Sequence, residues 1–509
     1  MTTTPEPEPV TATVGGAGAE SPTVQDLIAE ANAGGTLPPG AFTASDSGNA
    51  ARLVHLYGDV IRYAADSRTW YVWEGSRWRR DTGDLAVLAL TLGVSAYTRT
   101  METGIMPDEV DRYTRFALQS ESEPARRRML RLAATHPRVV ILEEDLDAAR
   151  DVLVVRNGTL ELRTGTLRPS RPEDMCTRRA GVAFDPAAQA PRWREHVRLV
   201  TGGGLTEADE TPESRVLAAY LQRAAGYTLT GLIGEQKFFF LWGDGQNGKN
   251  VFVETLLGLL GEYGAIAPTG LLTGGSGQHP TVLADLRGAR LVMADETGHD
   301  RINEARLKML TGSARVKARL MGKDFFEYDS TMKLWVLGNA KPAIKDQTEG
   351  TWRRMQLVPF TVRIPDEVKR ADFADVLRDE WPGILNWCLE GLRGWQQLEG
   401  LGTPEVVTAA VAEYRHEEDE IGQWLEDCCE PCDLADYTAV PALYSSYVMW
   451  AAANGLRHQE VLKRVAWGRA LTGRTYGAGK IGESGTERVN GTKTRVRYGI
   501  RLVKTGIGV

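Results

Sequence analysis

The stretch Lys237–Asn250, KFFFLWGDGQNGKN, decides the fold of the central part of the chain. Four consecutive apolar residues, Phe238 to Leu241, predict a buried strand, and the apolar run Val251 to Leu260 predicts a helix. The glycine-rich turn between them predicts a loop whose backbone N–H groups surround phosphate. The helix N-terminus and the Lys249 ammonium add positive charge there. A glycine turn with a purely structural role is the alternative.

The phosphate-loop residues are Gly243, Asp244, Gly245, Gln246, Asn247, Gly248, Lys249, Asn250 and Val251. They follow the pattern GxxxxGK, but Asn250 stands where such loops carry Ser or Thr as a Mg²⁺ ligand. An amide oxygen can also bind the ion, so Asn250 is a candidate ligand of weaker affinity. Strands that alternate with helices after this loop predict an α/β fold with a parallel sheet, whose ligand lies at the carboxyl edge.

The chain has 509 residues and a net charge of −7, so it is not basic overall, and its length predicts two to four domains. No apolar run approaches the roughly 18–20 residues of a membrane span, and the first residues lack a signal-peptide pattern. Five cysteines fit a reducing compartment. Three of them, Cys428, Cys429 and Cys432, are ordinary thiols or, alternatively, part of a zinc site without an evident fourth ligand.

Composition and pattern divide the chain into a disordered tail (1–48), an α+β domain (49–200), the α/β core (201–402), an acidic linker (403–439) and a basic domain (440–509). Five arginines in Arg126–Arg138 predict a solvated helix face or, alternatively, a nucleic-acid contact. The paired aspartates of a nucleotide polymerase are not apparent in the second segment. From Leu456 onward twelve basic residues stand against three acids.

Two strand ends after the phosphate loop carry candidate catalytic side chains. Arg290–Glu296, RLVMADE, predicts a strand whose Asp295 binds Mg²⁺ and whose Glu296 polarises water. A helix-capping acid pair is the alternative. Lys333–Leu337 predicts another strand, followed by Asn339, whose amide is expected to contact the γ-phosphate unless Gly-Asn is only a turn.

An arginine pair precedes the last predicted strand of the core. Arg353 or Arg354 could reach the nucleotide of a neighbouring subunit, which strongly accelerates such reactions. The alternative is local pairing with Asp346 or Glu349.

Two basic elements suit a nucleic-acid backbone. The first is a hairpin formed by 315–320 and 325–328, which carries Lys317, Arg319 and Lys323. An edge hairpin protected by lysines is its alternative. The second consists of two helices and the alternating strand Lys493–Val503, with Arg495 and Arg497, which predicts a winged-helix module. A basic strand that only maintains solubility is the alternative there.

This ordered set of motifs resembles the superfamily 3 helicases and, among them, the phage and plasmid primase-helicases with a poxvirus-like N-terminal domain. NGTLELRTGTL (157–167), LKMLTGSARVKAR (307–319) and TWRRMQLVPF (351–360) add to the resemblance, which spans about residues 50–505. It implies an AAA+-like ring, usually a hexamer, that hydrolyses ATP with Mg²⁺ between subunits. It also implies single-stranded or forked DNA and phage or host replication proteins as partners, in the cytoplasm of a bacterial host.

The resemblance also assigns roles to residues. Lys249 corresponds to the phosphate-loop lysine, Asp295 and Glu296 to the second acidic motif, Asn339 to the polar sensor, and Arg354, with Arg353 as substitute, to the arginine finger. Lys317, Arg319 and Lys323 lie where the family carries its DNA-tracking hairpin. Asn250 departs from the family, and no primase-polymerase domain is apparent, so primer synthesis is not expected.

Three other functions compete with the helicase. Asn250 favours a DNA-binding origin or loader ring with weak ATPase activity. A primase would synthesise primers on a bare template. A P-loop kinase of a small substrate would be indifferent to DNA, and the basic C-terminal segment argues against it.

Overall fold

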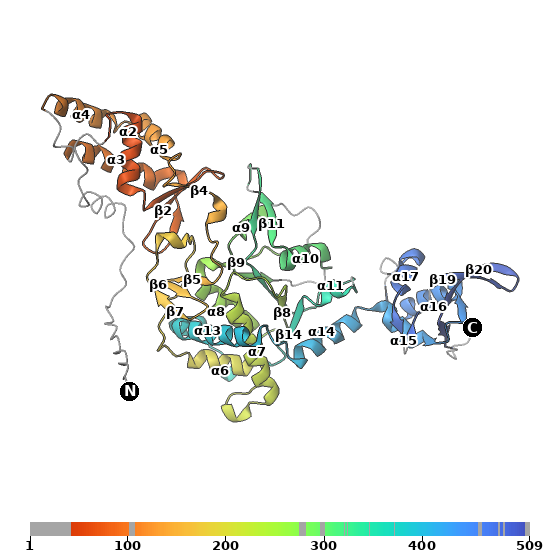
Figure 1. Ribbon diagram of the computed structural model, residues 1–509. Helices are drawn as coiled ribbons and strands as arrows, with labels where there is room; N and C mark the ends of the chain where they lie inside the picture. Colours follow the sequence, from red (N-terminus) through yellow and green to blue (C-terminus); the bar gives the residue numbers. More distant parts are fainter. Residues whose placement is uncertain are drawn as a thin grey trace, which may run out of the picture.

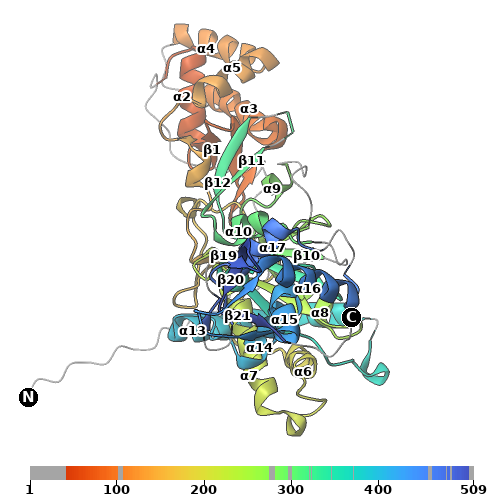
Figure 2. The ribbon, with the colours of Figure 1, turned by 90° about the vertical axis from the view of Figure 1, so that its right-hand side faces the viewer.

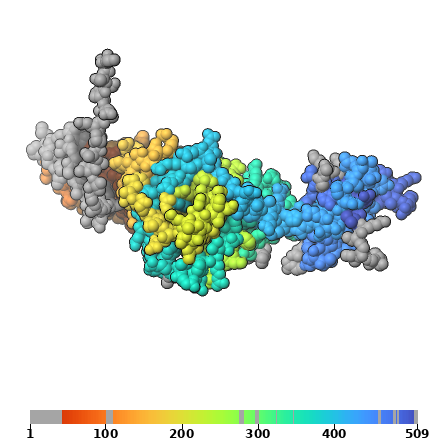
Figure 3. Space-filling view, turned by 90° about the horizontal axis from the view of Figure 1, so that it is seen from below, coloured from red at the N-terminus to blue at the C-terminus, as the bar shows by residue number. Residues whose placement is uncertain are grey.

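The computed structural model describes residues 42–100, 107–273, 281–295, 301–319, 321–322, 324–345, 347–370, 372–456, 461–476, 479–481 and 484–503. These residues form an elongated molecule of three lobes, with a narrow connection before the C-terminal lobe (Figures 1 and 3). The predicted disordered tail lies almost entirely outside the described residues, and the first described helix, α2, begins at Asp46.

The N-terminal lobe combines four helices with a four-stranded sheet of order β3-β2-β1-β4. The elements are α2 (Asp46–Tyr57), β1 (Ile61–Ala64), β2 (Thr69–Trp73), β3 (Trp78–Arg80), α3 (Leu85–Thr100), α4 (Pro107–Gln119), α5 (Glu123–Ala133) and β4 (Val140–Ile141). Leu53, Leu90 and Met129 are fully buried between them. β2 and β3 form a hairpin around Glu74-Gly75, in which Trp73 pairs with Trp78.

Three arginines of residues 126–138 contact side chains elsewhere in the N-terminal lobe. Arg126 donates to the Thr91 hydroxyl at 2.8 Å, and Arg128 pairs with Asp46 at 2.9 Å. Arg138 places one guanidinium nitrogen 2.7 Å from both carboxylate oxygens of Asp59. These three arginines thus have partners within the N-terminal lobe, and the choice between a solvated helix face and a nucleic-acid contact stays a prediction.

A small meander joins the N-terminal lobe to the central lobe. It consists of β5 (Val152–Val155), β6 (Gly158–Glu161) and β7 (Thr166–Arg168), and α6 (Pro191–Val200) follows. Leu153 and Trp193 are completely buried in the same cluster as Phe239 of the phosphate-loop strand. β5, β6 and α6 therefore contribute to the core of the central lobe, whereas the segment between β7 and α6 contacts the first sheet, because Trp78 of β3 donates to the carbonyls of Pro172 and Cys176 at 2.8 and 2.7 Å.

The central lobe is a five-stranded parallel sheet of order β14-β8-β13-β10-β9. Its strands are β8 (Phe238–Trp242), β9 (Gly264–Ile266), β10 (Leu291–Asp295), β13 (Lys333–Gly338) and β14 (Met355–Pro359). Its helices are α7 (Pro212–Thr228), α8 (Lys249–Leu260), α9 (Thr281–Asp285), α10 (Glu304–Gly312), α11 (Glu349–Trp352), α12 (Phe373–Asp379) and α13 (Trp381–Leu398). The α/β fold with a parallel sheet is confirmed.

Alternate residues of the strands bury themselves on opposite faces of this sheet. Phe239 and Leu241 join a cluster that includes residues of α7, α8 and α13. Phe238 and Phe240 join a second cluster that includes Leu307 of α10. Both faces of the sheet are therefore covered, which explains the continuous apolar runs in the strand sequences. The edge at which the strands end is left for a ligand.

A two-stranded antiparallel hairpin projects from the central lobe (Figure 2). Its strands are β11 (Arg315–Arg319) and β12 (Phe325–Asp329), as the sequence predicts. Val316 and Ala318 are buried, whereas the alternating side chains of Lys317 and Arg319 are exposed.

The C-terminal lobe follows α14 (Glu405–Glu417) and contains three helices and three small sheets. Its elements are α15 (Glu420–Cys428), β15 (Cys429–Pro431), β16 (Tyr437–Ala439), α16 (Val440–Ala453), α17 (Arg464–Leu471), β17 (Thr475–Tyr476), β18 (Gly479–Lys480), β19 (Ser484–Val489), β20 (Thr492–Tyr498) and β21 (Ile500–Leu502). In the described residues, no helix is both long and apolar enough to cross a membrane.

The acidic segment 403–439 is not the solvated linker that its charge predicts. Val407 and Tyr414 of α14 are buried, and the Tyr414 ring lies 5.4 Å from that of Trp352 in the central lobe. Trp424 of α15 is fully buried against Trp467 in the C-terminal lobe. These apolar residues recur at helical spacing among the acids, so each helix buries one face and exposes its carboxylates.

Candidate functional site

The phosphate loop between β8 and α8 needs glycine at two positions. A Cβ on Gly243 would lie 2.0 Å from the Phe360 carbonyl oxygen. Gly248 has a φ of 80°, in the left-handed region, and a Cβ there would lie 2.6 Å from a methyl carbon of Val200 and 2.7 Å from His196 Cε1. The close packing on both sides fixes the path of the loop.

The segment that follows β14 forms hydrogen bonds with the phosphate loop. We call residues 360–369 the strap. The Asn247 side-chain amide donates to the Phe360 carbonyl at 2.8 Å, and the Ile364 amide donates to the Gln246 carbonyl at 3.0 Å. Lys369 Nζ donates to Gln246 Oε1 at 2.8 Å. No motif in the sequence marks the strap, because its contacts arise only from tertiary packing.

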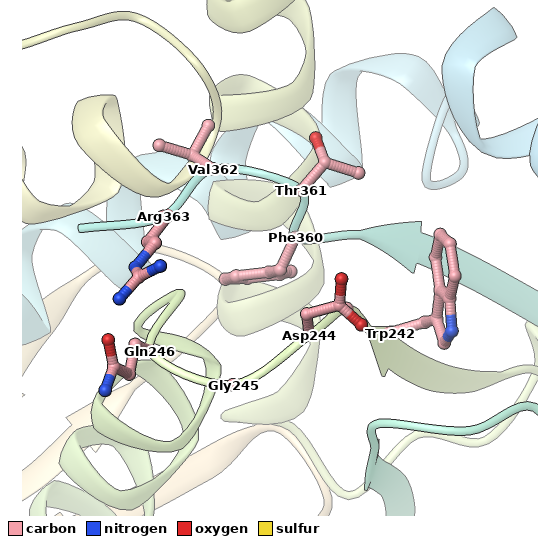
Figure 4. A pocket seen from close by; sticks show the side chains of 9 residues that line it. Trp242, Asp244, Gly245, Gln246, Phe360, Thr361, Val362 and Arg363 are labelled. Carbon is pink, nitrogen blue, oxygen red and sulfur yellow. The ribbon is translucent and has the colours of Figure 1, made fainter.

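Two cavities flank the loop, each of about 410 Å³. One lies between the first half of the loop and the strap, and Figure 4 shows the Arg363 guanidinium directed toward Gln246 there, with Trp242 on the far side. The other is lined by Lys249, Asn250, Asn339 and Lys369. The second cavity therefore contains the side chains that the sequence associates with phosphate.

Lys249 and Asn339 meet at the carboxyl edge of the sheet. Lys249 Nζ donates to Asn339 Oδ1 at 2.5 Å and to the Gly243 carbonyl at 3.1 Å. Only 5% of Lys249 is exposed, and burial lowers the pKa of its ammonium, while Asp295 and Asp244 act in the opposite direction. The cation thus has neutral acceptors as its direct hydrogen-bond partners among the described residues.

Asp295 is the last residue of β10 and is exposed. It pairs with Leu337 of β13, the strand that Asn339 follows, so Asp295 and Asn339 lie at the ends of neighbouring strands. Asn250 is exposed in the first turn of α8 and lines the Lys249 cavity. Glu296 lies outside the described residues, as do Lys323 of the basic hairpin and Asp346.

His196 of α6 packs against Gly248 of the phosphate loop, and no motif in the sequence indicates this contact. It is 4% exposed, and burial lowers its pKa to about 4. Within the described structure its Nε2 has no hydrogen-bond partner. The ring lies 5.5 Å from that of Phe373 in α12. A neutral imidazole therefore fills the space beneath Gly248.

The two arginines after α11 differ in exposure. Arg353 is exposed, whereas Arg354 is half-buried and donates to the Gly350 carbonyl. Burial, and then the neighbouring Arg353, lower the pKa of Arg354. Glu349, a candidate local partner, instead pairs with Arg415 at 3.0 Å.

The basic hairpin places an aromatic ring between its cations. Lys317 Nζ and Arg319 Cζ each lie 5.3 Å from the centre of the Phe325 ring. Phe325 is 52% exposed, and Met321 in the turn is 82% exposed. Cations beside an exposed ring are suited to a nucleic-acid strand with unstacked bases.

The two arginines predicted to contact nucleic acid in the C-terminal lobe have different environments. Arg495 is exposed. Arg497 is only 5% exposed and donates to the Gly468 carbonyl of α17 at 2.8 Å, so its expected surface position is corrected. A zinc site at the cysteines also gains no support, since the described residues contain no group of three or more potential ligands.

Comparison with known proteins finds matches to two segments of the chain. Residues 50–202 match a family described as D5 N terminal like, and residues 241–354 match a family of unknown function, DUF5906. "Putative helicase L207/L206" of Acanthamoeba polyphaga mimivirus is 26% identical over 335 residues, which cover 61% of this chain and 34% of the relative. "Putative helicase 022R" of Frog virus 3 is 26% identical over 377 residues, covering 58% of this chain and 38% of the relative.

These matches support a viral or phage primase-helicase family. The chain spans about a third of the length of these two relatives. A third relative, "Putative helicase 184R" of Invertebrate iridescent virus 6, is 24% identical over 249 residues, which cover 47% of this chain and 25% of the relative.

Among solved structures, the match to the apo C-terminal region of NrS-1 covers 88% of this chain and 97% of the NrS-1 fragment. Its TM-score is 0.49 and its sequence identity is 10%. The support for the family comes from the sequence matches and not from this likeness.

Proposed function

We propose that the chain is an ATP-dependent DNA helicase of viral or phage DNA replication, with an AAA+-like core of superfamily 3 type. The observation that carries this proposal is the contact between Lys249 and Asn339, 2.5 Å apart, at a parallel-sheet edge that also holds Asp295. Relatives named as helicases support the choice of reaction.

The side chains of the Lys249 cavity fit ATP and Mg²⁺. A cavity of about 410 Å³ adjoins the loop. Among the described residues the hydrogen-bond acceptors of the lysine are neutral oxygens, which phosphate oxygens can replace with a gain in charge complementarity. Asp295 and Asn250 offer the hard oxygen ligands that Mg²⁺ prefers. Bound ATP would supply the phosphoanhydride bond whose hydrolysis drives movement.

Each residue of the site then has a defined task. Lys249 neutralises the β- and γ-phosphates, Asn339 orients the lysine and senses the γ-phosphate, and Asp295 holds the metal ion. Glu296 follows Asp295 in the chain and is proposed to orient the attacking water.

We propose a homo-oligomer, with a hexameric ring as the expected form, in which an arginine of one subunit reaches the next subunit's nucleotide. Arg353 is exposed without rearrangement, whereas Arg354 would have to leave the Gly350 carbonyl. Mixing Lys249→Ala subunits with Arg353→Ala or Arg354→Ala subunits tests this arrangement. Recovery of turnover in a mixture identifies an arginine that acts between subunits, and its absence in both mixtures contradicts the ring.

The β11–β12 hairpin is proposed to bind one DNA strand through Lys317, Arg319 and Phe325. Cations contact phosphates, and an exposed ring stacks on bases with about 1–3 kcal/mol per base. Phage or host replication proteins are proposed as partners, and 440–509 as a winged-helix DNA-binding domain. The bacterial host and its cytoplasm remain predictions from the resemblance.

Unwinding of a forked DNA duplex tests the helicase function. The wild-type chain is expected to separate the strands with ATP, while a Lys317→Ala/Arg319→Ala double variant loses unwinding and keeps nucleotide binding. Lys345→Ala, at an exposed lysine outside the hairpin, is the matched control. Absence of unwinding by the wild type on forks of either polarity would refute the proposal.

A DNA-binding origin or loader ring with weak ATPase activity is the second candidate. The exposed Asn250 at the usual Ser/Thr position favours it. DNA binding combined with ATP turnover that DNA does not stimulate would select this candidate.

A further inference from the structure

The strap brings a second cation to the cavity that Lys249 lines. Among the described residues around this cavity, Lys249 and Lys369 are the two that carry positive charge. Lys249 is 5% exposed at the sheet edge, whereas the side chain of Lys369 is 32% exposed. The phosphate-loop pattern accounts for the first lysine and gives no role to the second.

Hydrogen bonds to the loop fix the backbone that carries Lys369. The Phe360 amide donates to the Trp242 carbonyl at 2.7 Å, and the Ile364 amide donates to the Gln246 carbonyl at 3.0 Å. Gln246 has a φ of 67°, which is uncommon for a residue with a side chain and recurs at functional loops. Figure 4 shows the Gln246 side chain on the side of the loop that faces the strap. The strap and the loop therefore form one unit, from which the partly exposed lysine side chain can turn without a change of backbone.

The present partners of Lys369 are ones that a phosphate can replace. Its ammonium donates to Gln246 Oε1 at 2.8 Å and to the carboxylate of Asp366, three positions earlier. The hydrogen bond from Lys369 lowers the pKa of Asp366, so this carboxylate is ionised at neutral pH. The Asp366 side chain is 79% exposed, and ion pairs at such positions contribute little to stability. A phosphate oxygen in the cavity is a stronger acceptor for the ammonium than an exposed carboxylate.

We propose that Lys369 binds a phosphate group of the nucleotide, exchanging Asp366 for it. Lys249 approaches the phosphates from the sheet edge, and Lys369 approaches them from the strap. Since Asn250 is a weaker Mg²⁺ ligand than Ser or Thr, a second lysine supplies positive charge that the metal site provides less firmly. The inference rests on the proposed nucleotide site and deepens it, because it adds a binding residue from a segment that follows the core sheet.

Displacement of a fluorescent ATP analogue by ATP and Mg²⁺, with the full chain and without DNA, tests the exchange. Lys369→Met removes a charge-assisted hydrogen bond and should weaken ATP binding about tenfold, while Lys369→Arg should stay within about threefold of the wild type. Asp366→Asn removes the competing carboxylate and should strengthen ATP binding about two- to threefold. In the Lys369→Met background the same substitution should have no effect, because the lysine for which Asp366 competes is gone.

Arg370→Met is the matched control, since Arg370 is the next cation in the chain, is exposed and pairs with Asp372 at 2.9 Å. Its ATP affinity should equal that of the wild type, and an unchanged thermal unfolding midpoint identifies each variant as folded. Unchanged ATP affinity in Lys369→Met would overturn the inference. Weaker binding in both Lys369→Met and Asp366→Asn would also overturn it, because the ion pair would then only fasten the strap. A wild type that binds no nucleotide would instead refute the proposed nucleotide site itself.

Discussion

Replacing Lys249 with methionine is expected to abolish ATP binding while leaving the free energy of unfolding nearly unchanged. The ammonium has hydrogen bonds of 2.5 and 3.1 Å to neutral oxygens and is 5% exposed. Each bond to a charged group contributes about 1.5–3 kcal/mol, while burying the ion costs several kcal/mol. Methionine removes both contributions and retains the apolar stem, so the free energy of unfolding without nucleotide should change by less than about 2 kcal/mol.

Bound ATP should stabilise the wild type but not this variant. At a concentration of one hundred times Kd, a ligand that binds only the folded state stabilises it by about 2.7 kcal/mol. For a domain of about 200 residues this corresponds to an increase in Tm of about 5–10 °C. Lys249→Met removes the cation that neutralises the phosphates, so its Tm should not respond to ATP.

Differential scanning fluorimetry with and without Mg²⁺ and ATP measures this difference. Lys345→Met is the control, because Lys345 is exposed outside the cavity, and its Tm should rise as in the wild type. An ATP-dependent increase of equal size in Lys249→Met would show that Lys249 does not bind the phosphates and that the nucleotide lies elsewhere.

Three further substitutions test the surroundings of the loop. Since burial lowers the pKa of His196 from 6.5 to about 4, the unfolded state binds more protons in that window. Wild type should then lose about 2 kcal/mol more stability than His196→Gln between pH 8 and 5 in urea unfolding, and equal losses would contradict this. Gly248→Ala should lower the free energy of unfolding by about 2–4 kcal/mol, because its Cβ would lie 2.6 Å from Val200. Gly245→Ala is the control: its Cβ would have nothing within 4 Å, so the loss in the same assay should be less than about 0.5 kcal/mol. Asn250→Thr should lower the Mg²⁺ concentration for half-maximal ATP turnover, and an unchanged Mg²⁺ titration would exclude a metal-binding role.

Elements whose signal is local could be predicted from the sequence. The apolar run of β8 and the turn around Gly322 between β11 and β12 are encoded by neighbouring residues, and both appear at the predicted positions. The order of the sheet could not be predicted in the same way, because β13 lies between β8 and β10 through pairing of distant segments.

Residues that act through tertiary packing had no signal in the sequence. His196 reaches the loop from a helix about fifty positions earlier, and Lys369 reaches Gln246 from the strap. Arg495 and Arg497 are two positions apart in a strand and therefore share one of its faces. Only Arg497 is covered by α17, and Arg495 is exposed. The strand pattern predicts the common face and cannot predict which part of it a neighbouring helix buries.

ATP hydrolysis by wild type and Lys249→Ala, each with and without single-stranded DNA, is the decisive test of a DNA-stimulated ATPase centred on Lys249. We expect turnover that increases with DNA in the wild type and is absent in the variant. Turnover that DNA does not change, or that survives in Lys249→Ala, would contradict it.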